Sequence, residues 1–402
     1  MLSTLHENIS AMEPLIPSAG RGKLSELTCD ILREAGGLSR ALPSPVARTE
    51  VRRLVREMNS YYSNLIEGHK TFPQDIERAL KDDFSAVPEK KNNQLLSRAH
   101  VEVEGLMEKR VEEGELEIHS SEFLCWLHGE FYRRLPDALH WAETESGKKY
   151  RIEPGVLRSF EVTVGSHHAP RHGVLGDFLD RFAAFYDDPG ILATDRLIAV
   201  AAAHHRLAWI HPFGDGNGRV IRLHSHALLI RNRVDGLGLW TLSRGLARAR
   251  QEYYERLRGA DHRRQGDYDG RGNLSEKGLV AFCEFFLETM LDQIRFMGEL
   301  LDLQNLTRRI DSWFEREAFH IPRYREEMSR LVRALLVEGE IPRTRVLDII
   351  SKGETLTRRV IKAAVEEGVI ATPSERGKLS IAFPSKVVES YFPKLFLDLP
   401  VG

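Results

Sequence analysis

A stretch of twelve residues gathers side chains and backbone that are suited to holding phosphate groups. It runs His211-Pro-Phe-Gly-Asp-Gly-Asn-Gly-Arg-Val-Ile-Arg222. In its glycine-rich turn, successive backbone N–H groups can converge on an oxyanion, and the N-terminus of the helix expected to follow adds about half a positive charge. The stretch therefore predicts a site for the phosphates of a nucleotide.

Individual residues of this stretch have different chemical uses. Arg219 and Arg222 are one helical turn apart, and each can offer a fork of donors to phosphate oxygens. Asp215 is a carboxylate beside the phosphate site and can hold Mg²⁺, which takes one or two carboxylates together with substrate phosphates. His211 is mostly neutral near pH 7, so it can accept a proton from an attacking hydroxyl. The other predicted nucleotide contacts are Gly214, Gly216, Asn217 and Gly218.

The same stretch also has a purely structural interpretation, in which His211 ends a helix and the glycines form an ordinary loop. The remaining histidines are not assigned to a site. His204 and His205 are expected in a buried helix, and His168-x-x-x-His172 is expected in a loop. Neither pair has a third ligand at zinc-like spacing, so no metal is expected there.

The composition is that of an ordinary globular protein. Of the 402 residues, 42% are hydrophobic and 29% are charged, and the formal net charge of −2 gives no global attraction to nucleic acid or to acidic membranes. Cys29, Cys125 and Cys283 are widely spaced, which indicates core residues in a reducing compartment without a disulfide framework. No apolar run approaches the roughly 20 residues of a membrane span, so a cytoplasmic protein is expected.

Helical periodicity dominates the chain and predicts a mainly α fold. The clearest case is residues 50–67, where apolar residues recur every three or four positions along one face. Residues 158–165 instead alternate apolar and polar side chains and are bounded by glycine, which predicts a short strand or hairpin arm. The helices expected before the C-terminal region cover residues 22–36, 50–67, 121–134, 174–187, 194–210, 219–232, 246–258 and 275–300.

On these residues the chain resembles the Fic (Fic/Doc) family, whose signature is His-x-Phe-x-Asp/Glu-Gly-Asn-Gly-Arg-x-x-Arg. Every fixed position of the signature is matched between His211 and Arg222. The resemblance implies a Fic-fold helical bundle with a β-hairpin flap and an N-terminal inhibitory helical region. It also implies that ATP and Mg²⁺ bind, and that AMP passes from ATP to a Ser, Thr or Tyr hydroxyl of a target protein.

Two further features gain a role from this resemblance. Pro154-Gly-Val-Leu-Arg158 is similar to the pattern that precedes the family's flap, which pairs with a target segment as an added strand. The flap residues expected to dock the target are Glu161, Val162, Thr163 and Val164. A hairpin that only braces the core is the alternative. Tyr253 and Tyr254 are placed like residues that line the adenine pocket in relatives, although tyrosines at helical spacing also pack in cores.

The helix expected at residues 50–67 ends in Ser63-Asn-Leu-Ile-Glu67-Gly68, which resembles the family's inhibitory motif Ser/Thr-x-x-x-Glu-Gly/Asn. In the family this glutamate pairs with the second arginine of the signature, here Arg222, and occupies the space of the ATP γ-phosphate. The resemblance thus assigns inhibition to Ser63, Glu67 and Gly68. The alternative is a purely structural role, in which Gly68 is the glycine that terminates the helix. Ser3-Thr-Leu-His-Glu7-Asn8 fits the same pattern but lies in a terminal segment expected to fray.

The C-terminal region has a pattern of its own, with three helices followed by a hairpin that begins at Gly368. This order predicts a winged helix-turn-helix domain with helices at residues 326–336, 344–351 and 355–367. Residues 341–386 contain nine Lys or Arg and five Asp or Glu, and Arg358, Arg359 and Lys362 are the candidates for contact with a DNA backbone. Dimerisation or protein docking is the alternative use of such a domain.

The sequence therefore predicts an N-terminal helical region with the inhibitory motif at residues 1–110, a Fic catalytic core at 111–305 and a winged-helix domain at 320–395. The favoured function is a protein adenylyltransferase that uses ATP and Mg²⁺ and is autoinhibited by Glu67. One alternative is an enzyme that removes AMP from a modified target, with Glu67 aligning a water. Another is a DNA-binding regulator or toxin-antitoxin-type module whose core senses nucleotide. Self-modification and a homodimer are further expectations, and the target protein stays unidentified.

Overall fold

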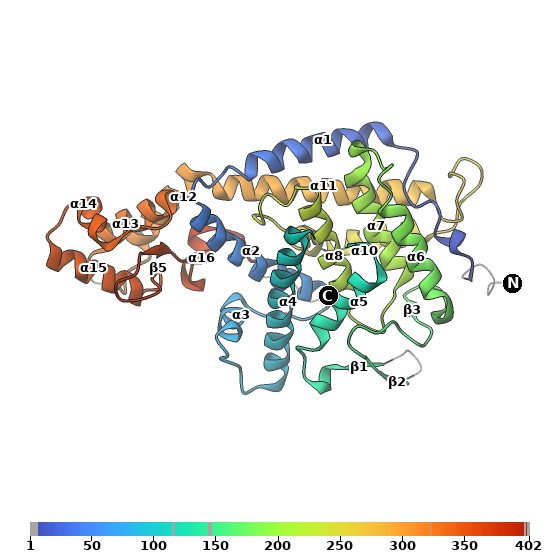
Figure 1. Ribbon diagram of the computed structural model, residues 1–402, viewed down its shortest axis with the longest axis horizontal. Coiled ribbons are helices and arrows are strands. Elements are labelled where there is room, and N and C mark those ends of the chain that lie inside the picture. Colours follow the sequence, from blue (N-terminus) through green and yellow to red (C-terminus); the bar gives the residue numbers. More distant parts are fainter. Residues whose placement is uncertain (1–6, 115–116, 144–146, 322, 398, 400–402) are drawn as a thin grey trace.

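The computed structural model describes residues 7–114, 117–143, 147–321, 323–397 and 399, and Figure 1 shows a mainly helical molecule. Within these residues, the sheets are three two-stranded antiparallel pairs. The mainly α fold predicted from the sequence is confirmed. Residues Ser3 to His6 of the second inhibitory-type match lie outside the described residues, so that match is not described.

The centre of the larger lobe is formed by two buried helices, α7 and α8, which pack against each other. Small side chains run through α7 from Ala199 to Ala203 and let neighbouring helices approach closely. In α8 the buried residues include arginines and histidines, which apolar periodicity does not reveal. The helices that surround this pair include α4, α5, α6 and α11. Their bounds are α4 Pro88–Glu113, α5 Ser121–Tyr132, α6 Leu175–Tyr186, α7 Arg196–Ile210, α8 Asn217–Arg231 and α11 Glu276–Leu301.

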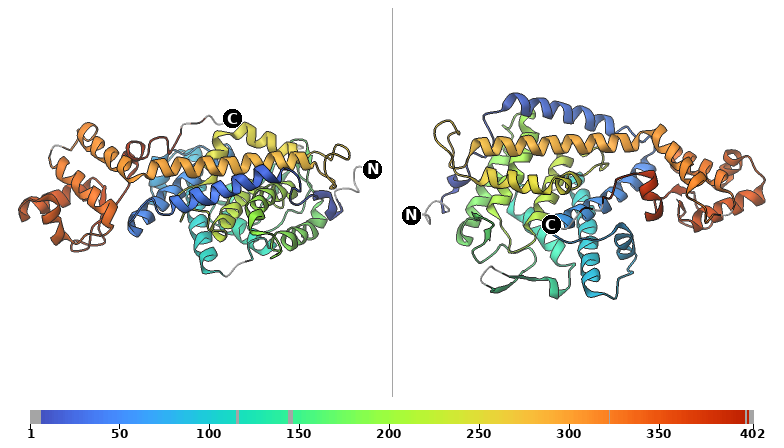
Figure 2. Two further views of the ribbon diagram at one scale, coloured as in Figure 1. Left: turned by 90° about the horizontal axis from the view of Figure 1, so that it is seen from above. Right: turned by 180° about the vertical axis from the view of Figure 1, so that it is seen from behind.

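Helix α1 (Arg21–Leu38) lies along α11, so the first long helix and one of the last helices of the larger lobe are neighbours (Figures 1 and 2). The apolar stripe of α1, which includes Leu24, Ile31 and Leu38, is buried in this contact layer. The predicted N-terminal region and catalytic core consequently share one hydrophobic core.

Helix α2 (Pro45–Ile66) carries the predicted inhibitory motif at its C-terminal end. It begins five residues before the predicted start because Ser44 accepts a hydrogen bond from the Ala47 N–H at 3.2 Å and proline occupies the first helical position. Every residue from Glu57 to Ile66 is buried. Because α4, α8 and α9 (Leu242–Arg248) contact this helix, its end has a fixed place against the core.

Four α-helices of the described residues were not among the predicted ranges. They are α3 (Pro73–Leu80), α4, α12 (Leu303–Arg316) and α16 (Ser385–Tyr391). The buried face of α4 mixes the apolar Leu96, Val103 and Met107 with polar side chains such as His100 and Glu104, so the apolar repeat that predicts a helix is diluted there. The single helix predicted at 246–258 is two helices, α9 and α10 (Arg250–Asp261), because Ala249 leaves the helical conformation with φ −105° and ψ 33°.

The predicted strand at residues 158–165 is wrong in extent. The strand β3 covers only Thr163–Val164 and pairs with β4 (His167–His168), while residues 158–162 lie outside any strand. The reason is that the Arg158 side chain and backbone bond to neighbouring loops instead of to a partner strand. A second hairpin, β1 (Trp141–Glu143) with β2 (Lys149–Arg151), precedes it and was not predicted.

A smaller lobe lies at one end of the molecule (Figure 1). It contains the predicted three helices followed by a hairpin, and Ile341 adds a bridge to Leu379 beside the hairpin. This order is compatible with the winged-helix interpretation. Two of the candidate DNA-binding cations on α15 already have carboxylates one turn away, with Arg358 3.3 Å from Glu354 and Lys362 3.7 Å from Glu366. The elements are α13 Arg325–Glu338, α14 Val346–Ile350, α15 Glu354–Glu366, β5 Ile370–Ala371, β6 Ser380–Ile381 and α16 Ser385–Tyr391.

The segment after α16 folds back onto α2. The Tyr61 hydroxyl donates to the Leu397 carbonyl at 2.7 Å. The Tyr62 hydroxyl donates to the Leu395 carbonyl at 3.1 Å and accepts from the Leu397 N–H at 2.7 Å. From α9, Arg244 Nη2 donates to the Lys394 carbonyl at 2.8 Å. The C-terminal segment is thus bonded to the residues that immediately precede Ser63.

The described helices include none whose length and hydropathy would suit it to cross a membrane. The expectation that all three cysteines are core residues is only partly right. Cys283 is buried and Cys125 is half-buried, but Cys29 is exposed because it lies on the outer face of α1.

We predict that Tyr62→Phe lowers the free energy of unfolding by about 1–3 kcal/mol, because it leaves the Leu395 carbonyl and the Leu397 N–H without their shared partner. Urea unfolding followed by circular dichroism measures this change. Tyr268 is 94% exposed, so Tyr268→Phe is the matched control and should alter stability by less than about 0.5 kcal/mol. Equal stabilities of the two variants would show that the tail contact contributes nothing.

Candidate active site

His211 lies where α7 ends, in the left-handed region with φ 51° and ψ 63°. This conformation costs a residue with a side chain about 1 kcal/mol, so the surroundings must hold it. Burial, together with the positive Arg158 and the nearby His167, lowers the pKa of His211 to about 4. The imidazole is therefore neutral near pH 7 and has the protonation state that a general base needs.

The buried Arg158 guanidinium holds His211 in place. Its Nε donates to the His211 carbonyl at 2.8 Å, and the Arg158 backbone N–H donates to the Pro212 carbonyl at 3.0 Å. The same side chain donates to the carbonyls of Phe160, at 2.9 Å, and of Pro170. Burial lowers its pKa to about 10, which leaves it charged at neutral pH. Arg158 therefore joins the hairpin segment to the loop that carries His211.

The turn between α7 and α8 is closed by Asn217. Its Oδ1 accepts from the Phe213 N–H at 2.9 Å, and its Nδ2 donates to the Phe213 carbonyl at 2.8 Å. Gly216 has φ 75°, and a Cβ there would lie 2.9 Å from the Tyr132 ring, so glycine is required for both reasons. Phe213 stacks on His128 with ring centroids 4.1 Å apart. Asn217 thus shapes the predicted phosphate cradle, and its contact with nucleotide stays a prediction.

Asp215 is the exposed carboxylate of this turn. Its Oδ2 accepts a 2.5 Å hydrogen bond from the Tyr132 hydroxyl. Desolvation in the loop raises the pKa of Asp215, but Arg219, the Tyr132 hydroxyl and the Gly216 N–H outweigh it, and the pKa lies below its ordinary value. Asp215 is consequently an ionised oxygen donor beside the cradle, which is the ligand type that Mg²⁺ prefers.

Arg222 and Glu67 form an ion pair, with 2.7 Å between Arg222 Nη2 and Glu67 Oε1. Arg222 also donates from Nε to the Ser63 hydroxyl and from Nη2 to the Ser63 carbonyl, both at 2.9 Å. Desolvation opposes the charge on Glu67, but Arg222 and Arg219 lower the pKa of Glu67 below its ordinary value. The carboxylate is therefore charged, and it consumes donors of the second signature arginine.

The carboxylate of Glu67 lies directly over the start of α8. A Cβ on Gly218 would lie only 2.1 Å from Glu67 Oε1, so the absence of a side chain at Gly218 is what lets the carboxylate approach. Next to it, Arg219 Nε donates to Asn64 Oδ1 at 3.1 Å. Both signature arginines therefore bond to the last turn of α2.

Glu67 is positioned toward Arg222 by the hydrogen-bonded motif that terminates α2. The His69 N–H donates to the Asn64 carbonyl at 2.9 Å, and the Gly68 N–H donates to the Leu65 carbonyl at 3.0 Å. Gly68 has φ 88°. This pairing is the Schellman arrangement, in which a left-handed glycine ends the helix. The structural interpretation of Gly68 and the pairing of Glu67 with Arg222 are thus both correct.

The two tyrosines proposed for the adenine pocket have different surroundings. Tyr253 is 4% exposed, and its hydroxyl lies 2.8 Å from His204 Nε2, whose Nδ1 lies 2.8 Å from the Ser225 hydroxyl. Tyr253 therefore belongs to a buried hydrogen-bonded network, which agrees with the alternative prediction that it is a core tyrosine. The half-buried Tyr254 donates to the Ile66 carbonyl at 3.3 Å, beside Glu67. A nucleotide contact is therefore better proposed for Tyr254 than for Tyr253.

The predicted docking residues of the flap lie mostly at the surface. Glu161, Thr163 and Val164 are exposed and Val162 is half-buried. The hairpin is tied to the site because His167 Nε2 lies 2.7 Å from the Trp209 carbonyl, two residues before His211. Its exposed strand β3 is therefore held at a fixed position near the histidine.

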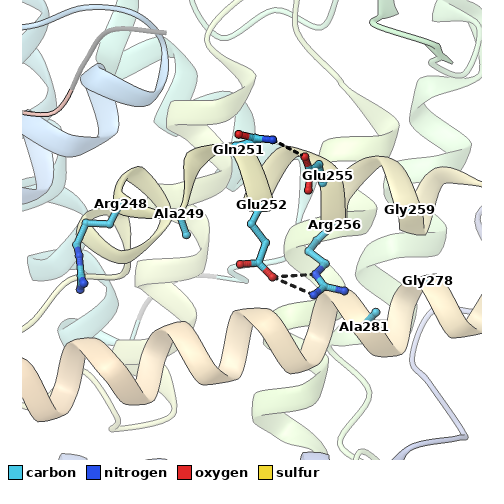
Figure 3. A pocket seen from close by; sticks show the side chains of 9 residues that line it. All are labelled: Arg248, Ala249, Gln251, Glu252, Glu255, Arg256, Gly259, Gly278 and Ala281. Carbon is cyan, nitrogen blue, oxygen red and sulfur yellow. Dashed lines mark hydrogen bonds and ion pairs between the residues drawn. The ribbon is translucent and has the colours of Figure 1, made fainter.

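A surface groove of about 650 Å³ lies between α10 and α11 (Figure 3). Glu252 and Arg256 pair across its wall at 2.9 Å. Its lining contains none of the predicted site residues, so it is separate from the site. The lining residues are Arg248, Ala249, Gln251, Glu252, Glu255, Arg256, Gly259, Gly278 and Ala281.

Sequence reasoning missed three residues that shape the site, namely Tyr132, His128 and Asn64. The first two are one helical turn apart on α5 and stack with ring centroids 4.5 Å apart, a spacing that is also typical of core aromatics. Asn64 lies inside the recognised motif at a position where the motif allows any residue. A local pattern could not identify them, because each acts on a segment distant in the sequence.

Part of the chain is similar in sequence to known Fic proteins. Residues 117–229 match the model of the Fic/DOC family. The chain is 30% identical over 226 residues to a protein adenylyltransferase Fic of Nematostella vectensis, a match that covers 54% of this chain and 47% of the relative. It is 27% identical over 187 residues to protein adenylyltransferase fic-1 of Caenorhabditis elegans, with 46% and 34% covered. The chain thus spans less than half the length of these curated relatives.

Solved structures show the same fold. A Fic family protein from Desulfovibrio desulfuricans has a TM-score of 0.52 and 18% identity, with 90% of this chain and 96% of that chain covered. Fic-1 from C. elegans, residues 134–508, has a TM-score of 0.50 and 19% identity, with 70% and 74% covered. These similarities establish a Fic-type fold.

We predict that His211 stays neutral between about pH 5 and pH 8, because burial and Arg158 keep its pKa near 4. NMR titration of the imidazole carbon resonances, assigned with a His211→Gln variant, measures this. The exposed His262 provides a reference imidazole in the same spectra. A His211 pKa near 6.5 would contradict the buried geometry.

We predict that Arg158→Gln raises the pKa of His211 and lowers the free energy of unfolding by about 2–4 kcal/mol, since it removes a nearby positive charge and leaves buried carbonyls unpaired. Arg158→Lys is the matched variant, because it keeps the charge but not the planar fork of donors. It should destabilise the protein while leaving the His211 pKa low. The same pKa in all three proteins would exclude the electrostatic part of this role.

Proposed function

We propose that this protein is an adenylyltransferase that transfers AMP from ATP to a hydroxyl of a target protein, and that Glu67 inhibits it. The observation that carries the proposal is the arrangement of a neutral His211 and an anion-binding turn next to an arginine, Arg222, that is already bonded to Glu67. The curated relatives named protein adenylyltransferase support the same reaction class.

In the proposed reaction, the target hydroxyl oxygen attacks the α-phosphorus of ATP. A bond forms between that oxygen and phosphorus, the bond from the α-phosphorus to the bridging oxygen breaks, and pyrophosphate leaves with the electron pair. His211 accepts the proton of the hydroxyl. The backbone N–H groups at the N-terminus of α8 would stabilise the negative charge that shifts between oxygens in the transition state.

The two signature arginines and Asp215 are proposed to bind the phosphates of ATP, directly or through Mg²⁺. Arg219 and Arg222 would bind the β- and γ-phosphates and favour the departing pyrophosphate. Mg²⁺ bound at Asp215 would supply further neutralisation of phosphate charge. The Tyr132 hydroxyl fixes one oxygen of Asp215 and leaves the remainder of the carboxylate available. The exposed strand β3 would position a target segment by pairing with it, as in the flap of the family.

In this proposal, Glu67 inhibits the protein because it competes with ATP for the guanidinium of Arg222. ATP needs Arg222 for its terminal phosphate, but Glu67 already accepts a 2.7 Å hydrogen bond from Arg222 Nη2. A charged carboxylate over Gly218 also repels an incoming phosphate and fills the space above the helix start. The resting protein is therefore expected to be mostly inactive until Glu67 moves away.

We predict that Glu67→Gly increases the labelling of the protein, or of an added target, by about tenfold or more with ATP labelled at the α-phosphate, because Arg222 becomes free. Ser63→Ala should increase labelling less, since it removes only one of the contacts to Arg222. The double variant His211→Ala with Glu67→Gly should lose labelling but keep the melting temperature of the Glu67→Gly single variant. Glu50→Gln, a substitution near the other end of α2, is the matched control and should behave like wild type.

Two results would overturn the proposal in different ways. Unchanged labelling in Glu67→Gly would reject Glu67 as the inhibitor. Labelling that persists without His211 would reject the assigned base. To test the alternative direction, AMP-modified Glu67→Gly protein is incubated with wild type, and release of AMP that depends on Glu67 of the wild type would show that removal is the main reaction.

A further inference from the structure

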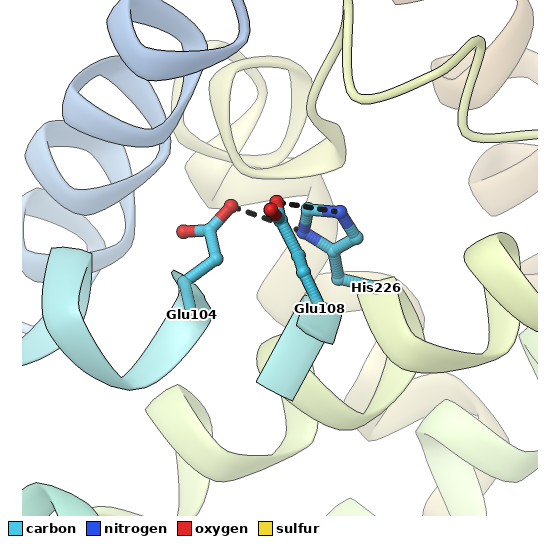
Figure 4. A group of neighbouring side chains, drawn as sticks. All are labelled: Glu104, Glu108 and His226. Carbon is cyan, nitrogen blue, oxygen red and sulfur yellow. Dashed lines mark ion pairs between the residues drawn. The ribbon is translucent and has the colours of Figure 1, made fainter. Parts of the chain in front are cut away.

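Helix α4 carries a stripe of titratable residues that the proposed reaction does not use. His100, Glu104 and Glu108 are spaced by four residues, so they lie on one face of the helix. This face meets α8, where His226 lies one turn beyond Arg222. Figure 4 shows the carboxylates of Glu104 and Glu108 and the imidazole of His226 directed toward one another.

The distances in this group are those between neighbouring ligands of one ion. His226 Nδ1 lies 3.1 Å from Glu104 Oε1, and His226 Nε2 lies 3.8 Å from Glu108 Oε1. One donor atom from each of the three residues lies within 4.8 Å of the others. Glu104, Glu108 and His226 are at most 8% exposed, so bulk water does not solvate the group.

In Glu104 and Glu108, the second carboxylate oxygen accepts hydrogen bonds from side chains of α2. Asn59 Nδ2 donates to Glu104 Oε2 at 2.8 Å. Arg52 Nε and Arg56 Nε donate to Glu108 Oε2 at 2.9 and 2.8 Å. The Oε1 atoms remain on the side of His226. Hydrogen bonds to the outer oxygens of ligating carboxylates are the usual support of a metal site.

Several buried atoms of this group have no hydrogen-bond partner within the described residues. They include Glu104 Oε1, His226 Nε2 and both ring nitrogens of His100. His226 Nδ1 and Glu104 Oε1, 3.1 Å apart, form an ion pair when the imidazole is protonated, which leaves His226 Nε2 and both ring nitrogens of His100 without a hydrogen-bond partner. Buried polar atoms that lack partners cost about 1–3 kcal/mol each, so a missing ion is a physical explanation for them.

The charges around the group favour a divalent cation. Two more carboxylates lie near Glu104 and Glu108, namely Glu112, which pairs with Arg52 at 2.6 Å, and Asp235. Burial lowers the pKa of His226, but the hydrogen bond to Glu104 and the negative charges of Glu104, Glu108 and Asp235 outweigh burial and raise it above its ordinary value. The guanidiniums that face these carboxylates are Arg52 and Arg56. With His226 neutral, the group has two more carboxylates than guanidiniums. A divalent ion balances that difference, whereas one proton on His226 balances half of it.

We propose that Glu104, Glu108 and His226 bind a divalent transition-metal ion of the Zn²⁺ type. One imidazole nitrogen and two carboxylate oxygens form a mixed ligand set that Zn²⁺ accepts, whereas Mg²⁺ and Ca²⁺ favour oxygen alone. The ion would join α4 to α8 directly and α2 through Arg52, Arg56 and Asn59. It would thereby stabilise the layer beneath Arg222 without taking part in AMP transfer, so the proposal does not rest on the proposed function.

The test uses the full chain with Asp215→Asn, which removes the candidate metal ligand of the active site. After treatment with a chelator and dialysis, the protein is loaded with Zn²⁺, and its metal content and melting temperature are measured. We expect about one tightly held Zn²⁺ per chain and a higher melting temperature, with no comparable effect of Mg²⁺. Adding His226→Gln or Glu104→Gln should abolish retention, while the exposed controls His262→Gln and Glu113→Gln should retain it.

A spectroscopic measurement covers the case in which the cluster variants do not fold. Loading Co²⁺ into the Asp215→Asn protein should give visible d–d absorption that one equivalent of Zn²⁺ removes. The proposal is overturned if no Zn²⁺ is retained and Co²⁺ gives no such spectrum, or if folded His226→Gln protein retains Zn²⁺ undiminished. If no metal binds, NMR detection of a doubly protonated His226 ring would show that a proton, and not a metal ion, balances the charge of Glu104 and Glu108.

Discussion

The ion pair between Arg222 and Glu67 is the interaction on which the arrangement of the site depends. It joins the central helix α8 to the end of α2, and Ser63 adds two hydrogen bonds to the same guanidinium. A buried arginine requires compensation, because leaving its charge unpaired would cost several kcal/mol. The fold meets this requirement with the carboxylate of Glu67, which ATP phosphates would replace under the proposed function. The same pairing would thereby support both the folded state and the proposed inhibition.

Placing one carboxylate so accurately requires support along the whole of α2. The helix begins at a serine cap and ends in a glycine-terminated motif, and its last ten residues are buried between α4, α8, α9 and the C-terminal segment. Tyr61 and Tyr62 bond to that segment, whereas Arg52, Arg56 and Asn59 bond to the carboxylates of α4. Any partner that displaced the C-terminal segment would therefore act on the helix that carries Glu67, and the cation proposed for α4 and α8 would oppose such a movement.

In the loop from His211 to Asn217, too, the residues proposed to act on substrate are held by other residues. His211 adopts a left-handed conformation that is unfavourable for a residue with a side chain, and Arg158 offsets this cost by bonding to its carbonyl. Asn217 closes the turn by bonding to Phe213, and Tyr132 orients Asp215. The residues with chemical roles are thus held by residues that need not touch a substrate.

The sequence by itself predicted the mainly helical fold, the candidate phosphate site from His211 to Arg222 and the motif that contains Glu67, because each depends on residues that are close together in the chain. It missed α4, whose buried face mixes polar and apolar side chains, and it extended the flap strand into residues that Arg158 holds in a loop. Only the tertiary structure brought Glu67 to Arg222, Tyr62 to Leu395 and Glu104 to His226. The physical reason is that these contacts arise from packing between helices distant in the sequence, and such packing leaves no periodic pattern in either segment.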